Sequence, residues 1–211
     1  MNRLRLDATD IARIAVFTAI VAVLGLPGGL SVFGSVPITA QTLGVMLAGA
    51  ILGPWRGALS MVVLLALVAI GLPLLSGGRG GIGVFVGPSA GYLIGWIAGA
   101  FAIGLIVHGG KRLSRWRTVL GVVVGGILVI YAFGIPVQSY VTRLPLGATA
   151  LQSLVFLPGD FIKAAIAAAI TMTLSRAYPR AFRRVHAAPS PTPAADASAD
   201  IEAEPVGGTT R

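Results

Sequence analysis

The chain has 211 residues, of which 55% are hydrophobic and 11% charged, and its formal net charge is +9. With a mean hydropathy of +0.88, this composition excludes an ordinary soluble globular domain and predicts an all-α integral membrane protein. Cysteine is absent, which excludes disulfides, thiolate metal sites and a cysteine nucleophile. The two histidines, His108 and His186, lie beside basic clusters near expected helix ends, so we expect no metal site.

Apolar segments recur along the chain, and most approach the ~20 residues that a helix needs to cross ~30 Å of hydrocarbon. They lie near 11–30, 39–53, 57–75, 89–108, 118–136 and 158–177. The second segment is short and requires tilting or shielding by its neighbours. We therefore predict a compact bundle of six transmembrane helices. The first should stay uncleaved, because the Pro-Gly-Gly that follows it does not match an Ala-x-Ala cleavage site.

The basic residues predict the orientation of this bundle. Twelve of them fall at the N-terminal end, in the 53–57 turn, in the 108–117 loop and at the C-terminal end, whereas the opposite loops hold only Arg79 and Arg143. By the positive-inside rule, both termini are cytoplasmic. The basic excess then reflects topology and attraction to anionic membrane lipid, and no nucleic-acid partner is expected.

The composition changes at about Pro189. Residues 189–211 are rich in Pro, Ala, Ser, Thr and acidic residues, with almost no large apolar side chains. Such a segment cannot bury enough surface to order itself. We predict a six-helix membrane domain over 1–188 and a disordered cytoplasmic tail over 189–211.

Small residues four positions apart recur on the predicted helices, and such rows allow close contact between transmembrane helices. The glycine rows are Gly49, Gly53 and Gly57; Gly91, Gly95 and Gly99; and Gly121 and Gly125. We interpret most of these rows as helix packing within the chain. Ala15 and Ala19 on the first helix form a similar row that could equally face another membrane protein.

The stretch 76–92 is not an ordinary helix, because five of the eight residues from 77 to 84 are glycine. At membrane depth, such backbone is tolerated only where it is buried in protein or lines a cavity. It is either a flexible outer loop or, given apolar residues such as Val84 and Phe85, a lid that folds back. It lacks the phosphate-binding pattern of a P-loop.

Asp160 is the only acidic residue between Asp10 and Asp196, and Lys163 follows it three positions later. In lipid, each charge costs roughly 2.5–3.5 kcal/mol at the centre of a helix. Near the start of the last predicted helix, Asp160 would be an N-cap and Lys163 its i+3 partner. The same two side chains, on one face, also suit a ligand that has N–H donors and a carboxylate. The two roles are compatible, and we expect direct ligand contact.

Several short motifs, in this order and spacing, resemble the BioY family, the biotin-specific substrate-binding (S) components of energy-coupling-factor (ECF) transporters. The motifs are Val36-Pro-Ile-Thr-Ala-Gln-Thr-Leu-Gly44, Ala48-Gly49, Leu52-Gly53-Pro54-Trp-Arg-Gly57, Gly71-Leu-Pro73, Gly77-Gly-Arg-Gly-Gly81, Gly87-Pro-Ser-Ala-Gly-Tyr92 and Pro158-Gly-Asp160 with Lys163. The resemblance covers most of residues 11–175. Ser89-Ala90 stands where many members have Thr-Gly, and Ala40 stands where Leu is common, but both keep small or apolar character.

The resemblance implies high-affinity capture of biotin from the outer face. Biotin has a ureido group with two N–H donors, an apolar ring and a carboxylate, which a mostly apolar pocket with few polar groups would complement. Asp160 and Lys163 are the expected main polar contacts, with Lys163 meeting the carboxylate. The further expected contacts are Arg79, Gly80 and Gly81 in a closing loop, Phe85 as apolar cover, and Tyr92 and Gln41 as hydrogen-bonding groups.

The chain has no ATP-binding motif, so the resemblance implies partners: a transmembrane coupling subunit and two cytoplasmic ATPase subunits, with Ala15 and Ala19 at the contact. We expect no cofactor, no catalytic residue and no enzyme activity. Two alternatives stay open at this stage. The chain could be an S component for another vitamin, or a biotin transporter that works without dedicated partners.

Overall fold

A computed structural model describes residues 6–28, 36–110, 113–179 and 182. Over these residues the chain is helical and contains isolated bridges but no strand, so the prediction of an all-α fold is confirmed. The predicted tail, 189–211, lies outside the described residues, as does His186.

Eight α-helices and three short helical segments follow one another in the described part of the chain. They are α1 (Ala8–Val23), α2 (Gln41–Leu52), α3 (Pro54–Ala69), η1 (Ile82–Phe85), α4 (Ala90–His108), α5 (Arg115–Val123), η2 (Val124–Val129), α6 (Ile130–Thr142), α7 (Leu146–Ser153), η3 (Leu154–Phe156) and α8 (Leu157–Ala177). The segments from α5 to α6 run on without a break, as do those from α7 to α8.

Three continuous helices are long and apolar enough to cross a membrane: Ala90–His108, Arg115–Thr142 and Leu146–Ala177. Helices α2 and α3 are apolar but shorter. Large apolar side chains also face outward along the bundle, among them Val62, Ile94, Leu105, Leu128, Phe133 and Ile166. Such surfaces suit lipid rather than water, so the structure is that of a membrane protein, while the number of crossings stays a prediction.

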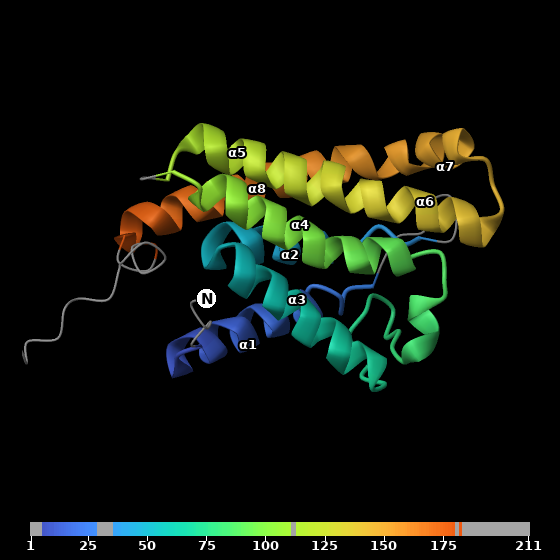
Figure 1. The fold of residues 1–211 in the computed structure, drawn as a ribbon, viewed down its shortest axis with the longest axis horizontal. Helices are drawn as coiled ribbons and strands as arrows, with labels where there is room; N and C mark the ends of the chain where they lie inside the picture. The colour runs from blue at the N-terminus through green and yellow to red at the C-terminus, as the bar shows by residue number, and fades with distance from the viewer. Residues whose placement is uncertain (1–5, 29–35, 111–112, 180–181, 183–211) are drawn as a thin grey trace, which may run out of the picture.

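Helix α4 lies at the centre of the bundle, packed against α2, α3 and the α5–α6 helix (Figure 1). Glycine allows the closest approaches: a methyl group on Gly49 would overlap the backbone of Ala100, and one on Gly99 would overlap the carbonyl of Gly125. The interpretation of these glycine rows as packing within the chain is therefore confirmed.

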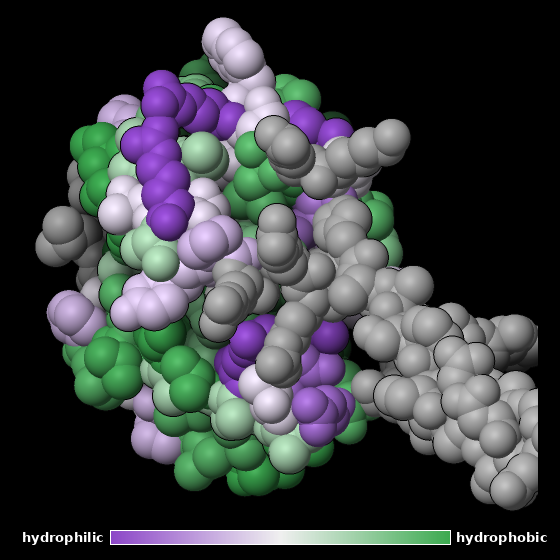
Figure 2. Space-filling view, turned by 90° about the vertical axis from the view of Figure 1, so that its left-hand side faces the viewer, coloured by the Kyte–Doolittle hydropathy of each residue, from purple (hydrophilic) through white to green (hydrophobic). Residues whose placement is uncertain are grey.

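The end of the bundle where α1 and α5 begin and α8 ends carries Arg13, Arg56, Arg115, Arg117 and Arg176. Hydrophilic side chains gather on this end, and hydrophobic ones cover much of the surface around it (Figure 2). The described basic residues are thus sorted between the two ends as the sequence analysis expected.

Two of the predicted helices are longer than expected. The fifth extends to Thr142 rather than 136, and the last is preceded by continuous helix from Leu146 rather than starting at 158. Polar residues in 137–157 lowered the local hydropathy and made this stretch resemble a loop. Inside the bundle these groups are satisfied: Gln138 Oε1 accepts from Tyr92 Oη at 2.8 Å, and Ser153 Oγ donates to the carbonyl of Thr149 at 2.9 Å.

Two other helices end earlier than expected. Helix α1 ends at Val23 and α3 at Ala69, although their apolar patterns continue to residues 30 and 75. In each case the helix stops shortly before a glycine and a proline, the residues least compatible with helix interiors. Hydropathy alone does not detect this termination.

Candidate binding site

A cavity lies between α2, α4, the α5–α6 helix and α8, beside the turn before η1. Its polar lining consists of Thr39, Gln41, Thr42, Arg79, Ser89, Tyr92, Tyr131, Asp160 and Lys163. Its apolar lining consists of Val36, Pro37, Ile38, Leu75, Leu93, Trp96, Gly126, Ile130 and Phe156. A mostly apolar cavity with a few convergent polar groups is the usual form of a small-molecule site.

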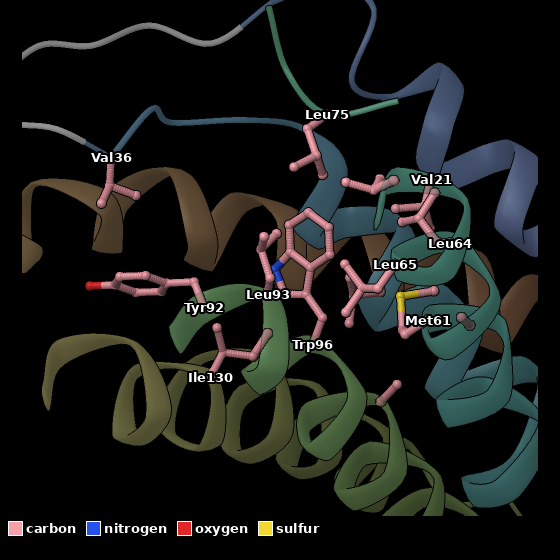
Figure 3. Close-up of a cluster of buried hydrophobic side chains, with 14 of the residues drawn as sticks. Val21, Val36, Met61, Leu64, Leu65, Leu75, Tyr92, Leu93, Trp96 and Ile130 are labelled. Carbon is pink, nitrogen blue, oxygen red and sulfur yellow. The ribbon is translucent and has the colours of Figure 1, made fainter. Parts of the chain in front are cut away.

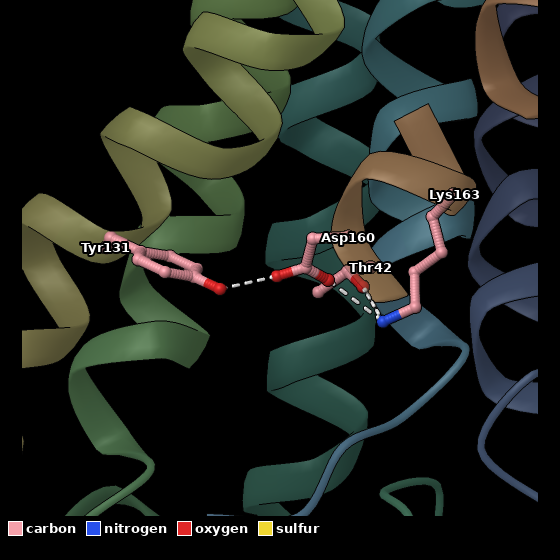
Figure 4. A network of polar contacts seen from close by, with 4 residues as sticks. All are labelled: Thr42, Tyr131, Asp160 and Lys163. Atoms are coloured by element: carbon pink, nitrogen blue, oxygen red, sulfur yellow. Dashed lines mark hydrogen bonds and ion pairs between the residues drawn. The ribbon is translucent and has the colours of Figure 1, made fainter. Parts of the chain in front are cut away.

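The strongest polar feature of the cavity is a four-residue network (Figure 4). Lys163 Nζ donates to Asp160 Oδ1 at 2.9 Å and to Thr42 Oγ1 at 3.0 Å. Tyr131 Oη donates to the second carboxylate oxygen, Asp160 Oδ2, at 2.7 Å. Asp160 is only 5% exposed. Its charge is balanced by Lys163, its i+3 neighbour, as predicted. Its carboxylate is also bonded to a tyrosine from another helix.

The predicted N-cap role of Asp160 is wrong. Helix α8 continues from η3, its cap position is Phe156 in a helical conformation, and no side chain caps it. The backbone N–H groups near Asp160 therefore belong to a continuing helix, and both carboxylate oxygens bond to side chains instead. Asp160 contributes to the cavity rather than to a helix end.

Apolar side chains from a buried cluster, shown in Figure 3, line the rest of the cavity. Leu75, Leu93, Trp96 and Ile130 are each at most 5% exposed and belong to one buried cluster. The indole N–H of Trp96 is buried and has no hydrogen-bond partner among the described residues. A buried tryptophan N–H usually has an acceptor, so this cavity wall carries an unused donor.

Arg79 lies in the tight turn of residues 77–81, which the backbone bridge between Leu75 and Arg79 closes. Three glycines of this turn have positive φ angles of 71° to 85°, which side chains rarely adopt. The Arg79 Nε donates to the carbonyl of Ser76 at 3.1 Å, and the side chain lines the cavity. The turn is therefore ordered by its own backbone and places one cation beside the cavity.

Gln41 lines the cavity, but its amide joins three segments of the chain. Its Nε2 donates to the carbonyls of Val21 and Leu74 at 3.2 and 3.1 Å, and its Oε1 accepts from the Ser76 backbone N–H at 3.1 Å. The side chain is 1% exposed. Its hydrogen-bonding groups thus hold the end of α1 and the turn before η1 against α2.

Tyr92 also lines the cavity, but its hydroxyl faces protein partners. It donates to Gln138 Oε1 at 2.8 Å and lies 3.1 Å from Ser153 Oγ. The ring stands edge-on to Tyr131 and Phe156, with centroids 6.2 and 6.4 Å away. Tyr92 therefore lines the cavity, while its hydroxyl is bonded to protein partners.

The remaining predicted contacts do not line the cavity. Gly80 lies against the backbone of Leu72, and Gly81 donates its N–H to the carbonyl of Val68 at 2.7 Å. Phe85 packs against the buried apolar cluster. Gly80 and Gly81 thus hold the turn that carries Arg79 against the end of α3, and Phe85 belongs to the apolar packing.

Among the lining residues that the sequence analysis did not single out, Thr42, Tyr131 and Trp96 carry the polar groups described above. Thr42 bonds to Lys163 across 121 positions of the chain, and no periodic pattern links the two. Tyr131 carries the only hydroxyl in the predicted 118–136 helix apart from Thr118. That isolated polar group in an apolar span was the one signal available.

Ala15 and Ala19 lie on an exposed face of α1 together with Ile11 and Val16. The opposite face of α1 packs on the bundle, where Thr18 Oγ1 donates to the carbonyl of Ser60 at 3.0 Å. The small-residue row therefore faces away from the rest of the chain.

Comparison with known proteins shows to which family this chain is related. The model of the BioY family matches residues 1–180. The biotin transporter BioY of Rhizobium etli is 47% identical over 170 residues, which cover 77% of this chain and 91% of that protein. The probable biotin transporter BioY of Bacillus subtilis is 49% identical over 164 residues, covering 77% of this chain and 88% of the relative.

A solved structure shares the fold. The crystal structure of an S-component for biotin from an ECF-type ABC transporter is similar to this chain, with a TM-score of 0.77 and 34% sequence identity. The similarity covers 83% of this chain and 94% of that one. The overall arrangement of helices in this chain is thus similar to that of the S-component for biotin.

Proposed function

Because the chain belongs to the BioY family, we propose that it binds biotin and acts in biotin uptake as the S component of an ECF-type transporter. The observation that carries this proposal is the Asp160–Lys163 pair, held open at a mostly apolar cavity by Tyr131 and Thr42. The identity of the ligand is inferred from the family, and the polar and apolar groups of the cavity are complementary to those of biotin.

The groups of biotin correspond to the groups of the cavity. Its two ureido N–H groups require an acceptor, and Asp160 is the only carboxylate among the described residues of the cavity wall. Its carboxylate requires a cation, and Lys163 has one ammonium N–H beyond the two already in use. Its apolar ring suits a wall such as that formed by Leu93 and Ile130. Arg79 is a second cation on the cavity wall and the alternative partner of the carboxylate.

For the membrane topology, we propose six crossings with both termini in the cytoplasm, in the cytoplasmic membrane of a prokaryote. The sorting of the described basic residues between the two ends of the bundle supports this orientation. The cavity adjoins the turn at the arginine-poor end, so biotin would enter from outside. The tail, 189–211, would then lie in the cytoplasm.

Transport requires more than capture, because a binding component alone has no differential affinity with which to drive release. A transmembrane coupling subunit and two cytoplasmic ATPase subunits would supply it. The exposed face of α1 with Ala15 and Ala19 supports a contact with the coupling subunit, since small residues allow close helix approach. Capture without dedicated partners is the alternative at this step.

A ligand panel tests the proposal. Biotin should raise the melting temperature of the detergent-purified protein and bind in calorimetry, whereas thiamine and riboflavin should do neither. Binding stabilises a folded state in proportion to the logarithm of ligand concentration over Kd. Stabilisation by another vitamin in place of biotin would reassign the substrate, and stabilisation by none would contradict the proposal.

A further inference from the structure

Tyr131 contacts the site from α6 and holds one side of the Asp160 carboxylate (Figure 4). Its hydroxyl is 2.7 Å from Oδ2, and the Lys163 ammonium is 2.9 Å from Oδ1. With one bond on each oxygen, the plane of the carboxylate is fixed from two sides. A carboxylate offers about four lone-pair sites, so lone pairs remain for donors of a ligand in the cavity.

Tyr131 is the second residue of α6, directly after the π-helical segment η2. A π-helix closes i→i+5 hydrogen bonds in place of i→i+4 and so shifts the register of the side chains that follow it. Gly126 of η2 and both Ile130 and Tyr131 of α6 line the cavity. The junction of the two segments therefore faces the cavity.

Close packing surrounds η2 at this turn. A methyl group on Gly125 would overlap Ile103 of α4, and one on Gly126 would come within 2.6 Å of the Met46 side chain of α2. The segment therefore touches both neighbouring helices at the base of the cavity. Tyr131 follows one turn later, where its ring can span the distance to α8.

We propose that Tyr131 is a positioning residue, which orients the Asp160 carboxylate so that its free lone pairs accept the N–H donors of the ligand. This inference rests on the proposed function, because biotin supplies those donors. Without the tyrosine hydroxyl, the carboxylate can turn about its bond to Lys163. It then presents the wrong oxygen to the ligand and holds the ammonium more closely.

The first test is the removal of one oxygen atom. Tyr131→Phe should weaken biotin binding roughly tenfold or more, because hydrogen bonds to charged groups are among the stronger ones. The matched control is Tyr140→Phe on the same helix, whose side chain is 86% exposed, and its Kd should stay within about twofold of the parent. The measurement is calorimetry in detergent, and unchanged binding by Tyr131→Phe would overturn the inference.

The second test distinguishes positioning from direct contact. In an Asp160→Asn background, Tyr131→Phe should weaken binding by less than about threefold, because residues that act as a unit are not additive. The same factor in both backgrounds would show that Tyr131 acts on the ligand or the bundle by itself, and would overturn the inference. The proposed function fails separately, if the parent protein does not bind biotin at all.

Discussion

The described part of the chain contains two ion pairs with buried carboxylates, and the two pairs differ in geometry. Arg56 binds Asp10 in a bidentate manner. Its Nε lies 3.0 Å from Oδ1, and its Nη2 donates to Oδ2 at 3.0 Å. Asp160 instead divides its oxygens between Lys163 and Tyr131, and Lys163 also reaches Thr42. In the first pair, which joins α1 and α3, both carboxylate oxygens bind the same arginine. In the second pair the two oxygens bind different residues, and both members of the pair line the cavity.

We propose that this difference separates a structural pair from a ligand-binding pair. Bidentate arginine–carboxylate pairing holds Asp10 and Arg56 in a fixed geometry, and neither residue lines the cavity. Asp160 and Lys163 do line it, and they keep an unused acceptor and an unused donor in a low-dielectric site, where a polar contact is worth more than in water. Burial of charge alone therefore does not identify a candidate site, because the position of the pair at a cavity is also needed.

Among the single substitutions, Lys163→Met should have the largest effect on biotin binding. Loss of one partner of a desolvated charge contact costs about 2–5 kcal/mol, so biotin should bind at least roughly 30-fold more weakly by calorimetry. Arg56→Met, the matched change in the other pair, should leave Kd within about threefold. Equal losses in the two variants would contradict the distinction between the pairs.

Gln41→Leu should mainly affect stability. It leaves the Val21 and Leu74 carbonyls and the Ser76 N–H without their partner, at a cost of about 2–3 kcal/mol in the free energy of unfolding. The melting temperature in detergent should fall clearly, whereas Gln152→Leu at an exposed site should barely change it. If Gln41→Leu instead weakens biotin binding as strongly as Lys163→Met, Gln41 contributes to ligand binding and its assignment as a purely structural residue is wrong.

Asp10→Asn should have a smaller effect on stability and none on binding. Its pair with Arg56 is buried on the carboxylate side but 26% exposed on the guanidinium side, so its loss should cost about 1–2 kcal/mol. The melting temperature should fall by a few degrees, with the Kd for biotin unchanged. A change in Kd would show that the α1–α3 contact communicates with the cavity.

The smallest stability change is expected when both charges of the binding pair are removed. Asp160→Leu combined with Lys163→Met replaces a buried pair by apolar groups, which is often neutral for folding. The melting temperature without ligand should stay close to that of the parent, while biotin binding is lost. A large destabilisation would show that this pair supports the bundle, as Asp10 and Arg56 do.

Local chemistry was sufficient to predict part of this protein. Apolar composition predicted a helical membrane protein, glycine spacing predicted close helix contacts, and the rarity of Asp160 and Lys163 in an apolar chain predicted their place in a site. The motifs around Gln41, Arg79 and Tyr92 belonged to the same cavity wall. These features depend on residue type and on short spacing, which the sequence shows directly.

Only the tertiary structure decided which groups complete the site. Thr42 and Tyr131 come from helices remote in sequence, and the hydroxyl of Tyr92 and the amide of Gln41 proved to be committed to protein partners. The π-helical turn before Tyr131 adds a rotation that no hydropathy pattern encodes. The physical reason is that a hydrogen bond depends on where a side chain points after packing, whereas the sequence alone specifies only that the group is present.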